Sequence, residues 1–248
     1  YAVTQLGDEY LGLMTVKHLE AMGLPTKIEY SKFPLYPVNP IPPAELSDEF
    51  IFLPPRTPSL IDGQPVGVVL ATSQRAAERA ANLIKLTGLT RCPDAAVLLD
   101  LETAPSAVPP MTFHRGDRAK TTKLFEDAKA GQGKADTELV SGTFAKGSQN
   151  HFYMEPQTSF VIPEEEGCLT VYTATQGTDI TLRVLSNQPK LKMHQLNIKF
   201  RRVGGGFGGK ITRSVPVALT AALAAKHFQR AVRLVLPRKV DMTLTGER

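Results

Sequence analysis

The feature that most constrains this chain is a glycine cluster between residues 201 and 213, where the sequence reads RRVGGGFGGKITR. Five of the six residues from Gly204 to Gly209 are glycine. Glycine loses more backbone entropy on folding than any other residue, so such a cluster fits a loop that approaches another group closely or takes positive φ angles. A strand predicted before the cluster and a helix predicted after it would let the loop amides and the helix N-terminus converge on an anion. The alternative is a tight strand-to-helix turn without a ligand.

Two nucleotide-binding patterns fit the cluster only in part. GGGFGG contains the G-x-G-x-x-G of dinucleotide-binding folds, but the strand predicted next, over 232–236, is followed by P-R-K and not by an acidic residue for the ribose. The stretch that ends at Lys210 also matches the G-x-x-x-x-G-K of a phosphate loop, in which Ser or Thr should follow to bind Mg²⁺. Ile211 stands there instead, and an apolar side chain cannot bind a hard cation. Both patterns are therefore disfavoured.

Outside the cluster, the sequence predicts an α+β fold. The spacing of apolar residues predicts a helix over 8–22. Nine prolines between Pro25 and Pro58 predict an extended connector, because proline fixes φ and lacks an amide donor. A Val-rich strand over 64–72 is followed by a helix that we expect to begin at the N-cap Ser73 and to end at Gly88.

The second half contains most of the predicted strands. Residues 103–137 mix Pro, Gly and Lys, which predicts a loop with a short helical turn. Residues 216–228 are apolar on nearly every side, which predicts a buried helix. β-branched and aromatic residues predict strands over 138–145, 157–163, 168–175, 196–203 and 232–236.

Composition excludes several classes of protein. Hydrophobic residues make up 42% of the 248 residues, which is enough for a packed core. The net charge of +5 comes without dense basic runs, which argues against nucleic-acid binding. No apolar run approaches the roughly 20 residues that span a membrane. Two cysteines, Cys92 and Cys168, are too few for a disulfide framework or a four-cysteine metal site, and they favour a reducing, cytoplasmic compartment.

Four motifs, in order, resemble the molybdenum hydroxylase family, which contains the xanthine dehydrogenases and aldehyde oxidases. The first motif is similar to the segment that closes the family's α/β hammerhead region, and the other three are similar to the first half of its molybdopterin-binding domain. The motifs are GQPVGVVLATSQRAAERAANLIK at 63–85, GSQNHFYMEPQ at 147–157, RRVGGGFGGK at 201–210 and DMTLTGER at 241–248.

This resemblance implies a division into three segments. Residues 1–62 match the family poorly and contain the Pro-rich connector. Residues 63–137 form a hammerhead-like α/β region and a loop. Residues 138–248 form the first part of a molybdopterin-binding domain, which we expect to be truncated.

The resemblance also implies contacts with a molybdenum–molybdopterin cofactor. Gln176, in TATQ at the end of a predicted strand, resembles the glutamine whose amide hydrogen-bonds the oxo ligand of the metal. Gly206, Phe207 and Gly208 resemble the loop whose backbone lies against the same metal–pterin region. Without the resemblance, a lone glutamine at a strand end would be interpreted as a solvated residue. The resemblance assigns no metal ligand to this chain.

Position 211 bears on the substrate. The xanthine-oxidising members resemble one another in carrying a glutamate directly after GGGFGGK, where this chain has Ile211. An apolar side chain cannot hydrogen-bond the edge of a purine, whereas it suits an aldehyde or another apolar heterocycle. The resemblance therefore points to the aldehyde oxidase branch, with Ile211 in the substrate pocket.

The resemblance further implies that the chain is part of a larger enzyme. The family hydroxylates a carbon next to oxygen or nitrogen, with water as the oxygen source, and electrons leave through iron–sulfur clusters and FAD. The glutamate that acts as general base, the substrate-orienting arginine, and the cluster and flavin domains lie beyond this chain in the family's order. We therefore expect no activity from the chain alone. We expect it to assemble with the remaining fragments or subunits as a homo- or hetero-oligomer.

A second hypothesis fits the same sequence. The start at Tyr1, the Pro-rich connector where hammerhead sequence is expected, and the end in TGER fit a non-catalytic binding or structural protein derived from a molybdopterin domain. Such a protein would hold a different, apolar ligand. Among other candidates, His151 and Glu155 lie four apart, but strand-like or loop-like flanks disfavour a metal pair. Residues 164–166 predict an exposed acidic turn.

Overall fold

The computed structural model describes residues 10–28, 49–59, 61, 63–86, 112–133 and 138–246. These residues fall into two compact units, one made of residues 1–85 with 148–248 and the other of residues 86–147. The division at residues 62 and 137 that the resemblance implied stays a prediction. No helix in the described part of the chain is both long and apolar enough to cross a membrane.

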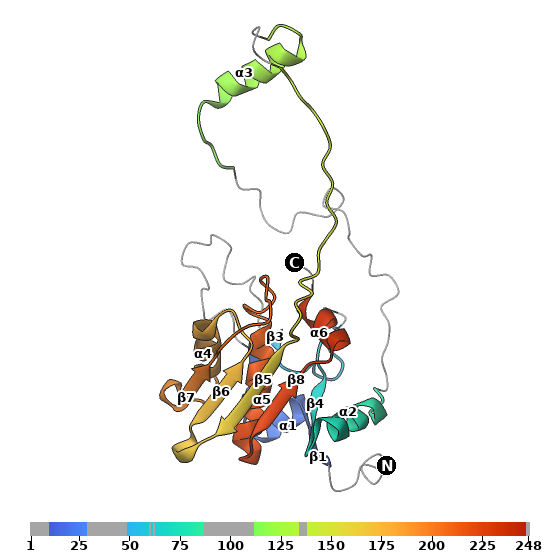
Figure 1. The fold of residues 1–248 in the computed structure, drawn as a ribbon, viewed down its shortest axis with the longest axis vertical. Helices are drawn as coiled ribbons and strands as arrows, with labels where there is room; N and C mark the ends of the chain where they lie inside the picture. The colour runs from blue at the N-terminus through green and yellow to red at the C-terminus, as the bar shows by residue number, and fades with distance from the viewer. Residues whose placement is uncertain are drawn as a thin grey trace. The chain divides into compact units, whose positions relative to one another are not determined.

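A four-stranded sheet forms the centre of the larger unit, in the order β7-β6-β5-β8 (Figure 1). β5 pairs antiparallel with β6 and with β8, whereas β6 and β7 run parallel. The strands confirm four of the predictions from β-branched and aromatic residues. Their bounds are β5 (Thr158–Pro163), β6 (Leu169–Thr173), β7 (Leu196–Lys199) and β8 (Val232–Val235), with the 3₁₀ turns η4 (Glu165–Gly167) and η5 (Met193–Gln195) before β6 and β7.

The helix α5 (Ser214–Phe228) packs against one face of this sheet. Its residues from Ser214 to Ala225 are nearly all buried, which confirms the predicted buried helix. α4 (Thr178–Ser186) packs against α5 and β7, and α6 (Arg238–Thr245) follows β8. Neither α4 nor α6 was predicted from the sequence.

The N-terminal part of the larger unit corrects one prediction. β1 (Tyr10–Thr15) is a strand that pairs antiparallel with β4 (Gly67–Ala71), and only α1 (Val16–Ala21) is helical in the stretch predicted as one helix. The helical prediction over 8–22 is therefore wrong in its first half, because pairing with a distant strand overrides local apolar spacing. β2 (Lys27–Ile28) and β3 (Glu49–Phe50) form a short antiparallel pair at the two ends of the Pro-rich connector, most of which lies outside the described residues.

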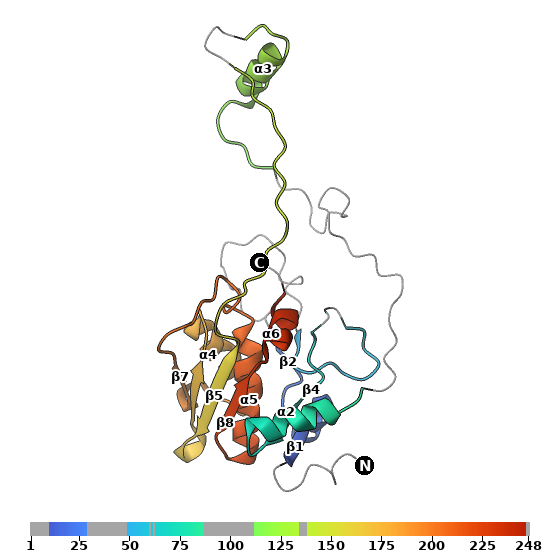
Figure 2. The ribbon, with the colours of Figure 1, turned by 45° about the vertical axis from the view of Figure 1, so that its right-hand side comes forward.

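The helix predicted after β4 is confirmed as α2 (Gln74–Leu83), which lies close to β4 (Figure 2). The Ser73 hydroxyl accepts a hydrogen bond from the Ala76 amide, as an N-cap should. The helix ends at Leu83, and Ile84 takes an extended conformation. The cap predicted at Gly88 lies outside the described residues.

In the smaller unit, α3 (Arg118–Lys129) replaces the loop with a short helical turn that the sequence predicted. The Asp117 side chain accepts from the Lys120 amide and starts the helix, which buries no residue. The strand predicted over 138–145 is wrong, since these residues are exposed and have no strand partner among the described residues. Strand propensity does not make a strand unless a second strand accepts its hydrogen bonds.

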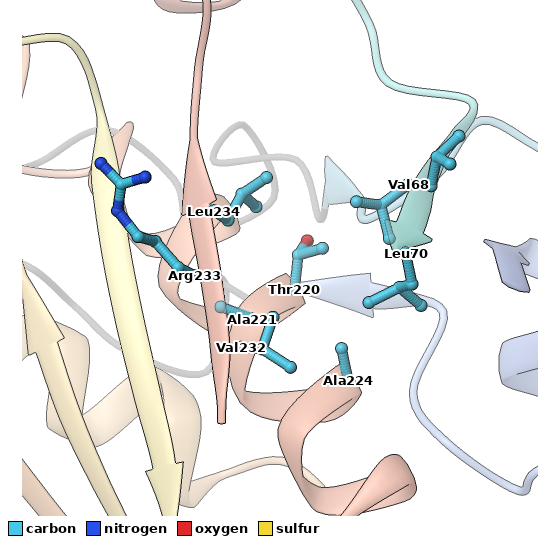
Figure 3. Close-up of a pocket in the computed structure, with 9 residues that line it drawn as sticks. Val68, Leu70, Thr220, Ala221, Ala224, Val232, Arg233 and Leu234 are labelled. Atoms are coloured by element: carbon cyan, nitrogen blue, oxygen red, sulfur yellow. The ribbon is translucent and has the colours of Figure 1, made fainter. Parts of the chain in front are cut away.

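A small apolar hollow lies between β4 and β8, over α5 (Figure 3). It contains none of the residues that the resemblance assigned to a cofactor or a substrate. The candidate site is therefore the glycine loop between β7 and α5 and not this hollow. The lining residues are Val68, Val69, Leu70, Thr220, Ala221, Ala224, Val232, Arg233 and Leu234.

Candidate functional site

The glycine cluster forms a loop with unusual backbone angles. φ is positive at Gly205 (85°), Phe207 (50°) and Gly208 (96°). Glycine adopts such angles without strain, whereas a residue with a side chain, such as Phe207, rarely does. The Phe207 side chain is also 55% exposed. Strained backbone of this kind concentrates at ligand-binding sites, so the loop is a candidate binding element.

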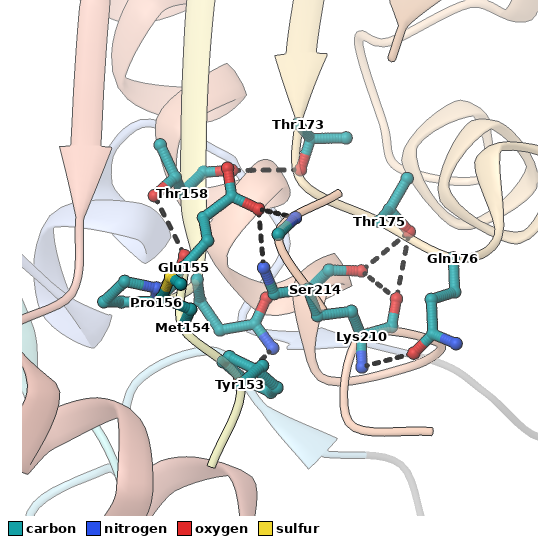
Figure 4. Close-up of polar contacts among 12 residues, drawn as sticks. Tyr153, Met154, Glu155, Pro156, Thr158, Thr173, Thr175, Gln176, Lys210 and Ser214 are labelled. Carbon is teal, nitrogen blue, oxygen red and sulfur yellow. Dashed lines mark hydrogen bonds and ion pairs between the residues drawn. The ribbon is translucent and has the colours of Figure 1, made fainter. Parts of the chain in front are cut away.

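The exposed side chain of Gln176 is held by this loop (Figure 4). Its Oε1 accepts from the Gly208 amide (3.0 Å) and the Lys210 amide (3.2 Å). Its own backbone amide donates to the Lys210 carbonyl oxygen (2.9 Å). Two N–H donors require an acceptor, so the carbonyl of the Gln176 side chain must face the loop. The NH₂ group is therefore turned away from these amides, where it can donate to a ligand.

Gly206 allows this arrangement because it has no side chain. A Cβ atom at Gly206 would lie 2.4 Å from Gln176 Oε1, which is too close for any real contact. The loop amides also differ from the expectation that they would converge on an anion. Gly208 and Lys210 donate to Gln176, and Gly209 donates to the Gly206 carbonyl (2.8 Å). The Gln176 NH₂ group is thus the outward donor of this part of the site.

An ion pair between Lys210 and Glu155 stabilises the loop. Lys210 is fully buried, and its Nζ lies 2.8 Å from Glu155 Oε2 and 4.6 Å from the centre of the Tyr153 ring. The same Glu155 oxygen accepts from the Gly204 amide (2.8 Å). From the sequence, Glu155 was considered only as part of a disfavoured metal pair. Its observed role is to compensate a buried ammonium group, which would be costly if left unpaired.

A second buried network lies beside this pair. The Tyr153 hydroxyl donates to Asp241 Oδ1 (2.9 Å), and the Gln157 side-chain amide donates to the Tyr153 hydroxyl (3.0 Å) and to the Gly209 carbonyl (2.9 Å). Burial, together with the hydrogen bond to the Asp241 carboxylate, raises the pKa of Tyr153 to about 12. Tyr153 therefore stays protonated at neutral pH and acts as a fixed donor.

The remaining candidates lie at the edges of the loop. Ile211 directly follows Lys210, is half-buried, and donates its amide to the Gly208 carbonyl (3.3 Å). The His151 ring lies under Gly209, where a Cβ atom would meet His151 Cγ at 2.8 Å. Within the described residues, no three His, Cys, Asp or Glu side chains come together as a metal site. The structure therefore brings Gln176 together with the glycine loop, and it places His151 and Glu155, which the sequence disfavoured as a metal pair, against the glycines of that loop.

The chain that has this geometry also matches a known protein family. The family model described as the molybdopterin cofactor-binding domain matches residues 112–248, which is more than half of the chain. The chain belongs to this family. The resemblance inferred from the four ordered motifs is thereby confirmed.

Curated relatives of this family member are plant aldehyde oxidases. Aldehyde oxidase 4 of Arabidopsis thaliana is 35% identical over 197 residues, and the match covers 75% of this chain and 14% of that protein. An indole-3-acetaldehyde oxidase of Zea mays is 36% identical over 186 residues, with 75% of this chain and 14% of that protein covered. The chain thus spans about one seventh of the length of these relatives. These matches place it near the aldehyde oxidase branch and do not favour the non-catalytic alternative.

Solved structures of two bacterial oxidoreductases share the fold. The aldehyde oxidoreductase from Desulfovibrio gigas matches with a TM-score of 0.62 and 22% identity, over 100% of this chain and 26% of that chain. The quinoline 2-oxidoreductase from Pseudomonas putida 86 matches with a TM-score of 0.63 and 18% identity, over 96% of this chain and 28% of that chain. The predicted α+β fold class is confirmed.

The ion pair beneath the loop predicts a dependence of stability on pH. Burial opposes ionisation of Glu155, but the hydrogen bonds from Lys210 and from the Gly204 amide outweigh it and lower the pKa of this carboxyl below its usual 4.5. The stabilisation is therefore complete above about pH 4.5 and is lost as the pH falls through the lowered pKa. Urea unfolding between pH 6 and pH 3 should show this loss. Tyr153, the other titratable group in contact with Lys210, does not change charge in this window.

A Glu155→Gln variant provides the control for this pH dependence. It removes the titrating group and keeps the size of the side chain, so its stability should fall less steeply than that of the wild type over the same range. Equal slopes for the two proteins would contradict the assignment.

Proposed function

We propose that this chain forms part of the cofactor site of an aldehyde oxidase-type molybdenum enzyme, which hydroxylates aldehydes or N-heterocycles with water as the oxygen source. The observation that carries the proposal is the amide of Gln176, whose oxygen is held by two loop amides so that its NH₂ group is directed outward. Family membership and the similarity to plant aldehyde oxidases support the reaction class.

The residues present fit a molybdopterin group. Gln176 offers a neutral donor of fixed orientation, and Gly206 and Gly208 offer backbone without side chains, which permits close approach. When bound, the group supplies the two-electron oxidation of the substrate carbon. Gln176 would hold the cofactor by a hydrogen bond, and Gly206, Phe207 and Gly208 would lie against it. Since the donor is fixed before binding, little reorganisation is needed when the cofactor enters.

The direct test of this proposal is the content of molybdenum and pterin in the native enzyme that carries this segment. Metal analysis by mass spectrometry and fluorescence of the released pterin should find both in amounts stoichiometric with the chain. Native, untreated material that contains neither would overturn the proposal.

Our proposal for the class of substrate rests on the side chain of Ile211. Its half-buried aliphatic side chain, at the end of the glycine loop, offers no hydrogen bond to a purine edge. A site without such a partner leaves the polar edge of a purine unpaired, which disfavours it strongly relative to an aldehyde. We therefore propose apolar aldehydes or apolar heterocycles as substrates.

Replacing Ile211 with glutamate should lower kcat/KM for apolar aldehydes by about tenfold to 100-fold, because the variant would place a carboxylate against the apolar substrate that we propose. Steady-state kinetics with one apolar aldehyde and one purine would measure the change. Ile211→Val is the matched control and should change both rates by less than about threefold. Unchanged kinetics with both substrates in Ile211→Glu would contradict the placement of Ile211 beside the substrate.

We also propose that other parts of the enzyme supply the groups that the resemblance places outside this chain. These are the general-base glutamate, the iron–sulfur clusters and FAD, contributed by further segments or by partner subunits. The curated relatives support this proposal, because this chain covers only 14% of their length. The cytoplasm is the proposed compartment.

A further inference from the structure

The carboxylate of Glu155, a residue outside the glycine loop, contacts both ends of that loop. Glu155 Oε2 lies 2.8 Å from the amide nitrogen of Gly204 and 2.8 Å from Nζ of Lys210. The Glu155 amide also donates to the Gly204 carbonyl (3.1 Å). Gly204 and Lys210 are the first and last residues of the GGGFGGK stretch. A single residue therefore ties the beginning of the loop to its end.

The contact with Gly204 leaves no space for a side chain. A Cβ atom at Gly204 would lie 2.6 Å from Glu155 Cβ, so the two backbones approach as closely as glycine allows. At the other end, Lys210 has no exposed surface, and Glu155 is the carboxylate paired with it. Because a buried ammonium group needs a compensating charge, the position of Lys210 depends on Glu155.

Lys210 in turn holds Gln176 with its backbone. The Lys210 amide donates to Gln176 Oε1 (3.2 Å), and the Lys210 carbonyl accepts from the Gln176 amide (2.9 Å). Figure 4 shows these groups in one continuous cluster, from Glu155 through Lys210 to Gln176. A displacement of Glu155 would therefore move Lys210 and, with it, the side-chain amide of Gln176.

We propose that Glu155 is a positioning residue: it fixes both ends of the glycine loop and, through Lys210, sets the orientation of the Gln176 amide. The inference rests on the proposed function, since that amide matters only if it faces a cofactor. In this role Glu155 acts through Lys210 and not through a contact of its own with the cofactor or the substrate. Charge-assisted hydrogen bonds are about twice as strong as neutral ones, so the ionised carboxylate is what makes this support effective.

Hydrogen exchange of the loop amides tests the proposal without relying on activity. In the complete polypeptide, exchange over residues 204–213 should be about tenfold faster in Glu155→Gln than in the wild type, because the carboxylate is lost while the shape is kept. Exchange in β5 and β6 should change much less. Glu164→Gln and Lys192→Met, which alter exposed charges away from the loop, are the matched controls and should leave loop exchange unchanged.

A double variant separates positioning from stability. Glu155→Met with Lys210→Met leaves no unpaired buried charge, so the protein should fold, yet the loop should exchange about 100-fold faster than in the wild type. In the loaded enzyme, Glu155→Gln should lower kcat and leave KM unchanged, as expected for a group that orients Gln176. Wild-type loop protection in the double variant would overturn the proposal.

The results also distinguish this inference from the proposed function. If Gln176→Ala lowers turnover while Glu155→Gln leaves loop exchange unchanged, the positioning role is wrong and the cofactor site stands. If Glu155→Gln loosens the loop while Gln176→Ala changes neither turnover nor cofactor content, the loop support is real and the cofactor site is wrong.

Discussion

Replacing Gln176 with alanine should lower turnover by about 10²–10³-fold for every substrate of the assembled enzyme, by analogy with the loss of one preorganised donor. The variant removes the NH₂ group that the amides of Gly208 and Lys210 direct outward. Steady-state kinetics on an aldehyde and on a heterocycle would measure the loss. Gln195→Ala is a control, because Gln195 binds the Glu166 carbonyl, away from the loop.

Replacing Gly206 with alanine should also lower turnover, because it displaces the side chain of Gln176. The added Cβ would lie 2.4 Å from Gln176 Oε1, the end of a flexible side chain that can swing away. The fold should therefore survive, as circular dichroism can show, while turnover falls in parallel with Gln176→Ala. A Gln176→Ala variant that affected only one substrate would contradict our assignment, since a donor to the cofactor serves all of them.

Replacing Asp241 with alanine should destabilise the protein by about 3–5 kcal/mol. Asp241 is 1% exposed, accepts from the Tyr153 hydroxyl and the Gln157 amide, and pairs with Arg238 (3.6 Å). Its loss leaves the buried Tyr153 hydroxyl and the Gln157 backbone amide without this acceptor and removes the carboxylate that faces Arg238. Thermal unfolding should show a fall in Tm of roughly 10 °C for a chain of this size.

The exposed Asp179 provides the comparison for Asp241. It lies in the first turn of α4, where a carboxylate interacts only with the helix dipole, so Asp179→Ala should cost less than about 1 kcal/mol. If the two variants had similar stabilities, the network around Tyr153 would not contribute as the structure indicates.

Sequence patterns predicted the elements whose formation is decided locally. β5, β6 and β8 follow from runs of β-branched and aromatic residues, and α5 follows from an apolar stretch of helical length. α2 has both an amphipathic face and a side-chain cap at Ser73. In each case the local preference agrees with the final fold, which is why the patterns were sufficient.

Elements decided by distant contacts or by weak local signals were missed. β1 has helix-like spacing but pairs with β4, more than 50 positions further along the chain. α4 follows the N-cap residue Gly177, which offers no side-chain cap, and α6 begins directly after Pro237, so neither helix has a side-chain cap as a start signal. Residues 138–145 have the composition of a strand without a strand partner in the described part of the chain.

The candidate site was predicted through resemblance more than through residue chemistry. Gln176, Gly206 and Gly208 were assigned to the cofactor by matching motifs, and that role stays a prediction. The structure shows a hydrogen bond from the Gly208 amide to Gln176 and a close approach of Gly206 to the same side chain. Glu155 was set aside because strand-like or loop-like flanks disfavoured a metal pair with His151. Its observed partner, Lys210, lies 55 positions away, a pairing that one sequence does not reveal. Asp241 was part of a matched motif, but its contact with Tyr153, 88 positions away, gave no local signal either.

These long sequence separations have a consequence for the order of folding. During synthesis, β5, β6 and the glycine loop leave the ribosome before Asp241 does, although Asp241 supports Tyr153 beneath that loop. Contacts between residues far apart in the chain require closure of a long loop, whose entropy cost must be met first. The hydrogen-bond network beside the glycine loop is therefore completed only when α6 has docked. Folding of this unit therefore ends with the docking of α6, after its sheet and its glycine loop have been synthesised.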